Sequence, residues 1–135
     1  MAEPTTPLEL DTATWLHQLY GTTETGWVTL FTIDRATGRP ATDWAPATDL
    51  DTLATAAAQR EPHSCVWFGV ATRNERLDDG RRGGATDCAQ IPAFWTDIDI
   101  AGPGHRGAGR LARDRRHAHQ IVSAFPLPPT AVIDT

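Results

Sequence analysis

Residues 91–100 (IPAFWTDIDI) constrain the fold of this chain more than any other segment. They form a continuous, largely apolar stretch with two carboxylates near its end. Continuous runs rich in β-branched and aromatic residues are typical of strands buried on both faces, so we expect a strand here. Because side chains alternate between the faces of a strand, Asp97 and Asp99 would share one face with Trp95. Buried carboxylates are costly unless a cation or an arginine neutralises them. The pattern therefore predicts a charge partner for the pair.

Asp97 and Asp99 are candidate metal ligands. Residues two apart on a strand have Cα atoms roughly 6.5–7 Å apart. Both carboxylates could then bind one divalent cation, or a pair of cations about 3.5–4 Å apart. An Asp-x-Asp pair is also common on the solvated face of an edge strand or at the start of a turn, here 101–104. The spacing alone leaves both interpretations open.

Arginines near the acidic pair are candidate phosphate ligands. Arg106 lies in a glycine-rich segment after the pair, Arg113 and Arg116 lie at the expected start of a helix, and Arg73 ends the apolar run 64–73. Basic residues beside an acidic pair suit a polyanionic, metal-chelated substrate, although a solvated helix face explains the same pattern. The net charge of −5 argues against a protein that coats nucleic acid non-specifically, but a local cluster of arginines can still hold phosphates.

Hydrophobic periodicity and the positions of Gly and Pro predict the remaining elements. We expect helices from Thr6 to Gly21, from Thr48 to Pro62 and over the segment that ends at Pro126, and strands over 27–33, 64–73, 91–100 and 130–134. Trp44 is expected in a Pro-containing loop. Since a loop joins strand 64–73 to strand 91–100, the order favours an α+β fold with a mixed or antiparallel sheet and helices packed on it, in a single domain spanning 1–135.

The chain carries no sign of secretion or of a membrane span. Cys65 and Cys88 lack paired-ligand spacing, so we expect reduced, buried thiols. The N-terminus has neither a basic start nor an apolar core, and no apolar run reaches the length of a membrane helix. We therefore expect a cytoplasmic protein without membrane partners.

Four segments in this order resemble the N-terminal half of a primase-polymerase domain: residues 64–73, the Arg- and Gly-bearing loop 74–90, residues 94–100 (FWTDIDI) and residues 126–135 (PLPPTAVIDT). The family is the archaeo-eukaryotic primase superfamily, in the branch found in phage, plasmid and integrated-element replication proteins, and the resemblance covers residues 25–135. In that family an apolar strand that ends in Asp-x-Asp supplies metal ligands, matched here by Asp97 and Asp99.

The resemblance implies template-directed nucleotidyl transfer with two Mg²⁺ or Mn²⁺ ions held by the catalytic residues Asp97 and Asp99. Nucleoside triphosphates and a DNA template would be partners, with a fused or separate helicase as a further one. Arg73, Arg106, Arg113 and Arg116 would hold phosphates or nucleic acid.

The resemblance also implies an incomplete catalytic core. In the family, a strand like 131–135 leads into a Gly-rich segment with a histidine that contacts the nucleotide, and a further Asp comes later. The chain ends before these motifs, so we expect weak or no activity from it alone. Two alternatives stay open: another Asp-x-Asp metal-dependent transferase, such as one that binds a nucleotide sugar, and a non-catalytic nucleic-acid-binding or adaptor module in which the pair is structural.

Overall fold

The computed structural model divides into two compact units, Met1–Phe94 and Trp95–Thr135. The structure describes residues 11–78, 80–103, 108–129 and 132. The first unit contains, in chain order, α1 (Thr12–Tyr20), β1 (Trp27–Asp34), β2 (Pro40–Pro46), α2 (Leu50–Arg60), β3 (Ser64–Phe68) and a short 3₁₀ helix (Ala85–Asp87). The second unit contains a short 3₁₀ helix (Ala108–Arg110) and α3 (Arg115–Ser123).

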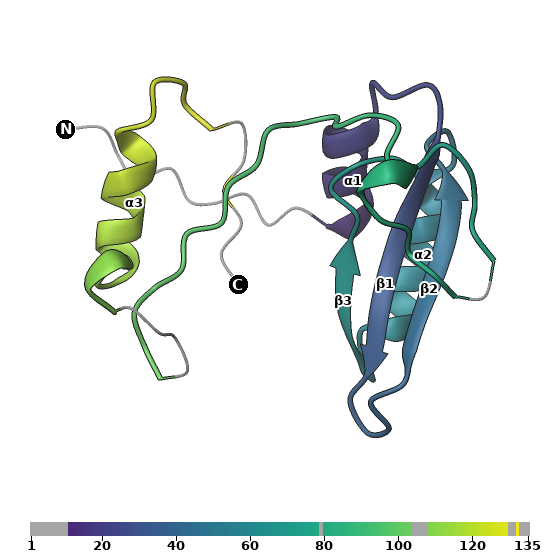
Figure 1. The fold of residues 1–135 in the computed structure, drawn as a ribbon, viewed down its shortest axis with the longest axis horizontal. Coiled ribbons are helices and arrows are strands. Elements are labelled where there is room, and N and C mark those ends of the chain that lie inside the picture. Colours follow the sequence, from purple (N-terminus) through teal and green to yellow (C-terminus); the bar gives the residue numbers. More distant parts are fainter. Residues whose placement is uncertain (1–10, 79, 104–107, 130–131, 133–135) are drawn as a thin grey trace. The chain divides into compact units, whose positions relative to one another are not determined.

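Three antiparallel strands form the sheet of the first unit, in the order β2-β1-β3 (Figure 1). β1 pairs with β2 from Trp27 opposite Pro46 onward, and with β3 from Leu30 opposite Phe68 onward. α2 covers one face of this sheet and contacts all three strands, while α1 packs against α2. The expected α+β fold, with an antiparallel sheet and helices packed on it, is therefore confirmed.

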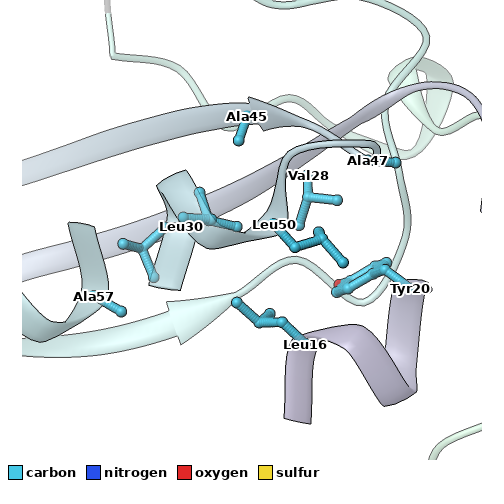
Figure 2. Close-up of a cluster of buried hydrophobic side chains, with 9 residues drawn as sticks. Leu16, Tyr20, Val28, Leu30, Ala45, Ala47, Leu50 and Ala57 are labelled. Carbon is cyan, nitrogen blue, oxygen red and sulfur yellow. The ribbon is translucent and has the colours of Figure 1, made fainter. Parts of the chain in front are cut away.

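The hydrophobic core of the first unit lies between its two helices and the sheet face that α2 covers (Figure 2). Val28 and Leu30, at alternate positions of β1, are both fully buried in it. The buried members of the cluster are Leu16, Tyr20, Val28, Leu30, Ala45, Ala47, Leu50, Leu53 and Ala57. Burying a Leu or Val side chain is worth about 1.5–3 kcal/mol. This cluster therefore fixes how α2 sits on the sheet.

Aspartates cap both helices of the first unit. The Asp11 carboxylate accepts a hydrogen bond from the backbone N–H of Thr14 at 2.9 Å, so α1 begins after Asp11. The start expected at Thr6 lies outside the described residues. Asp49 accepts from the backbone N–H of Thr52 at 3.3 Å in the same way. A carboxylate at this position satisfies an unpaired N–H and complements the helix dipole.

β2 is a strand that the sequence analysis placed in a loop. Trp44, expected in that loop, lies within β2. Pro40 and Pro46 stand at its two ends, and β2 is an edge strand of the described sheet. Proline lacks an N–H but is tolerated at the ends of edge strands. The loop prediction was wrong because these prolines delimit a strand rather than interrupt one.

The strand expected over 64–73 is broken after Phe68. The chain leaves the ladder there and rejoins it at Arg73, which forms a bridge with Trp27 on β1. On its other side Arg73 forms a second antiparallel bridge, with Cys88. The loop after β3 therefore returns to the sheet and adds a short pairing at that edge.

The strand expected over 91–100 is absent. Only Ile100 within it forms a bridge, with Ala112. The pairing that the returning loop makes ends at the carbonyl of Gln90, and Pro92 then offers no N–H to a neighbour. Three large apolar side chains in the segment are exposed: Ile91, Phe94 and Trp95. The prediction was wrong because apolar composition does not itself supply a partner strand, and a strand forms only where an edge pairs with it.

Other expectations have mixed outcomes. Of the strand over 130–134 only Val132 is described, and Arg106 also lies outside the described residues. Cys65 is exposed rather than buried, Cys88 is half-buried, and neither forms a disulfide. Within the described part of the chain, no helix has the length and apolar character needed to cross a membrane.

Candidate functional site

Asp97 and Asp99, the candidate metal ligands, lie at the start of the second unit in a segment without regular structure. Both residues are exposed, whereas Ile98 and Ile100 are half-buried. Exposure therefore alternates only over residues 97–100, because Phe94 and Thr96 are exposed as well. No described residue forms an ion pair with either carboxylate. The pair needs no charge partner for stability, because water solvates it, and both carboxylates are accessible to a ligand.

Backbone hydrogen bonds place the acidic pair beside the chain that leads into α3. The N–H of Ala112 donates to the carbonyl of Asp99 at 3.2 Å, and the N–H of Ala101 donates to the carbonyl of Ala112 at 2.8 Å. Ala112 is buried, with 2% of its surface exposed, so this contact belongs to the interior of the second unit. Arg113 follows directly. The acidic pair and the arginines at the start of α3 are therefore joined within one unit.

Two of the predicted phosphate ligands, Arg113 and Arg116, lie at the start of α3. Asp114 caps the helix by accepting from the N–H of His117 at 2.7 Å, and the N–H of Arg113 donates to Nδ1 of His117 at 3.0 Å. Nδ1 is thus an acceptor, so the neutral ring carries its proton on Nε2. Arg113 and Arg116 are exposed and line a surface depression of about 250 Å³ with Asp114, His117 and Gln120. The two guanidinium groups can pair with a phosphate, whereas the helix N-terminus itself is already capped by the Asp114 carboxylate.

Arg73, also predicted to hold phosphate, lies in the first unit and is buried, with 9% of its surface exposed. Its Nη1 donates to the carbonyl of Ala71 at 2.7 Å, and its Nε donates to the carbonyl of Arg82 at 3.1 Å. Nη1 also lies 3.5 Å from Sγ of Cys88. No carboxylate among the described residues forms an ion pair with it. The guanidinium therefore ties together the loop that follows β3.

The donor set of the acidic pair fits a metal ion only with help from other ligands. Among the described residues, no group of three or more His, Cys, Asp or Glu side chains could hold a metal ion. Mg²⁺ is commonly bound through one or two carboxylates, with water and substrate phosphates completing its octahedral shell. Asp97 and Asp99 match this kind of site, in which a phosphate-bearing substrate supplies the remaining oxygens.

The sheet carries a second candidate group of side chains, which the sequence analysis did not single out. Phe31 on β1 and Trp67 on β3 are opposite each other on the face away from α2, with ring centroids 5.8 Å apart. The guanidinium of Arg82 lies 4.6 Å from the centroid of the Phe31 ring. We call the surface formed by Phe31, Trp67 and Arg82 the outer face. The sequence indicates this surface in one way. Trp67 lies between Val66 and Phe68, which pack against the core, so alternation along the strand directs Trp67 to the opposite face.

Comparison of the chain with protein-family models, with curated proteins and with solved structures gives no match. Function is therefore inferred from the sequence motifs and from the geometry of the two groups of side chains.

Proposed function

We propose that this chain acts in metal-dependent, template-directed nucleotidyl transfer, as part of a DNA primase-polymerase of a mobile genetic element. Asp97 and Asp99 bind the divalent cations, and Arg113 and Arg116 bind phosphates of the incoming nucleoside triphosphate. The DNA template and a fused or separate helicase are the macromolecular partners. The Asp-x-Asp motif in its sequence context and one structural observation support this function.

That observation is the hydrogen bond from the N–H of Ala112 to the carbonyl of Asp99. It joins the acidic segment to the residue before Arg113, so carboxylates and guanidinium groups occupy one compact unit. A triphosphate chelated to a divalent cation presents both metal and anionic oxygens, and it needs ligands of both kinds close together.

The exposure of both carboxylates determines how they act. Each offers oxygens without first losing a protein partner, since no described residue forms an ion pair with it. Arg113 and Arg116 hold phosphate oxygens and neutralise their charge. Bound Mg²⁺ or Mn²⁺ would supply activation of the attacking 3′-hydroxyl and neutralisation of the transferred phosphoryl group.

The test is Mn²⁺ binding by titration calorimetry, with and without a nucleoside triphosphate. We expect the triphosphate to strengthen Mn²⁺ binding to the chain, and the double variant Asp97→Asn/Asp99→Asn to lose this binding. Asn has the same shape without the charge, so the folded state should survive. Asp78→Asn is the matched control, because Asp78 is also an exposed carboxylate but lies in the first unit.

Two results would count against the proposed function. Mn²⁺ binding that is unchanged in the double variant would remove the metal site from Asp97 and Asp99. Tighter binding of a nucleotide sugar than of a nucleoside triphosphate would instead favour another Asp-x-Asp transferase. A primer-extension assay with Mn²⁺ then measures nucleotidyl transfer directly.

A further inference from the structure

The outer face combines an accessible aromatic ring with a cation held beside it. Trp67 is 47% exposed although it lies within a strand. Its neighbours Val66 and Phe68 pack against the core, so alternation directs the Trp67 ring to the opposite face. Phe31 supports the ring from β1, with an angle of 38° between the two ring planes. A large indole ring that is held on a rigid sheet and open to solvent on one side is a platform for a flat ligand.

Two hydrogen bonds to backbone carbonyls of its loop hold Arg82 beside this platform, over the Phe31 ring. The carbonyl of Arg82 accepts a hydrogen bond from Nε of the buried Arg73 at 3.1 Å. Two residues earlier, the carbonyl of Gly80 accepts from Oγ1 of Thr42 on β2 at 2.6 Å. The loop that follows β3 is therefore anchored to the sheet on both sides of Arg81. These anchors hold Arg82 at the outer face, and Arg81 is its neighbour in the chain.

We propose that the outer face binds single-stranded nucleic acid, with a base stacked on Trp67 and the adjacent backbone phosphates held by Arg81 and Arg82. Sequence-tolerant binding of single strands combines aromatic rings, on which bases stack, with basic side chains that follow the backbone. The inference deepens the proposed function, on which it rests for the identity of the polymer, because a template-directed enzyme must hold an unpaired strand.

The guanidinium groups beside the rings favour a polyanion over an apolar partner. Arg81 and Arg82 are exposed, and the buried Arg73 adds a positive charge with no carboxylate paired to it among the described residues. The loop also carries acidic residues, of which Glu75 and Asp78 are exposed. An apolar peptide would have to desolvate the guanidinium groups, which costs free energy, whereas phosphates pair with them.

The experiment measures binding of a fluorescently labelled oligo(dT) by anisotropy, in EDTA, at several salt concentrations. We expect Trp67→Ala to weaken binding about tenfold or more, as for the loss of one base–aromatic stack, and Trp67→Phe to retain most of it. Arg82→Met should weaken binding and lower the salt dependence by about one counterion. Phe125→Ala and Arg39→Met are the matched controls, since Phe125 is an exposed ring of the second unit and Arg39 is exposed in the turn between β1 and β2.

Oligonucleotide binding that Trp67→Ala leaves unchanged, or that Phe125→Ala weakens as much, would overturn the inference. So would a wild-type chain that does not bind oligo(dT), or sedimentation showing that Trp67→Ala abolishes a dimer instead, because the outer face would then be an interface between copies. The two proposals fail separately. Asp97→Asn/Asp99→Asn should bind oligo(dT) normally in EDTA, and Trp67→Ala should bind Mn²⁺ normally.

Discussion

Replacing Arg73 by methionine separates a structural role of this buried arginine from a role in phosphate binding. Methionine fills most of the same space but cannot donate a hydrogen bond. In Arg73→Met the carbonyls of Ala71 and Arg82 lose their donors, which lie at 2.7 and 3.1 Å in the native chain. We therefore expect the loop after β3 to loosen and the first unit to lose stability.

The size of the effect follows from these two contacts. A hydrogen bond to a charged group contributes about 1.5–3 kcal/mol, so two contribute about 3–6 kcal/mol before any offset. Removing a buried guanidinium also removes its desolvation cost, which offsets part of that loss. We expect a net destabilisation of about 2–4 kcal/mol, which should lower the urea midpoint of unfolding by about 1–2 M.

Urea unfolding followed by tryptophan fluorescence is the assay, because Trp15, Trp27, Trp44 and Trp67 report on the first unit. Arg76→Met, at an exposed position of the same loop, is the control and should leave the midpoint unchanged. A structural role for Arg73 is refuted if Arg73→Met and the wild type have the same urea midpoint of unfolding. Lost triphosphate binding at unchanged stability would then establish Arg73 as a phosphate ligand.

Two further substitutions test the sheet and its first turn. Gly69→Ala should destabilise the first unit by about 1–3 kcal/mol, because the added Cβ would overlap Oγ1 of the buried Thr29. In a Thr29→Ala background, thermal unfolding should show a smaller loss of stability. An equal loss in both backgrounds would contradict the overlap. The Asp34 carboxylate accepts hydrogen bonds from the side chain and backbone N–H of Thr37, which lower its pKa. Its contribution to stability should be present above the unfolded-state pKa of about 3.9 and be lost as pH falls through the lowered folded-state pKa. The melting temperature of the wild type should therefore exceed that of Asp34→Asn near neutral pH by more than it does at about pH 2.5, and a difference that stays constant with pH would refute this.

Local signals in the sequence predicted the elements whose conformation is determined mainly by residues close by in the chain. β1 follows a run rich in Val, Thr and Phe, and its alternation put Val28 and Leu30 into the core. α2 ends at Arg60, before Pro62, because the residue that precedes a proline disfavours the helical conformation. The pattern of α3 was also found, with its arginines at the start. Each of these elements depends mainly on neighbours within a few residues.

Elements that depend on a distant partner were predicted less well. β2 exists because β1 pairs with it, although Pro40 and Pro46 at its ends read as loop residues. Trp67 was assigned only to a buried strand, since the sequence cannot show that the face away from α2 has a loop arginine over it. The burial of Arg73 follows from carbonyls at Ala71 and Arg82 that face it only after the loop folds. Pairing and loop closure are long-range events with weak local signatures.

Because Asp97 and Asp99 are exposed, they would bind a cation differently from a buried pair. Had residues 91–100 formed a buried strand, Asp97 and Asp99 would need a cation to offset the cost of burial, and the metal would bind to the protein alone. Solvated carboxylates have no such need, so two of them bind a divalent cation weakly without further oxygens.

At the proposed site, most of the affinity would then come from a complex that also contains the triphosphate. Linkage requires that the factor by which the nucleotide strengthens Mn²⁺ binding equals the factor by which Mn²⁺ strengthens nucleotide binding. Both factors should fall to about one in Asp97→Asn/Asp99→Asn, while Mn²⁺-independent contacts of Arg113 and Arg116 with the phosphates should remain. Equal coupling in the wild type and the double variant would mean that the nucleotide carries its cation to the arginines without using the carboxylates.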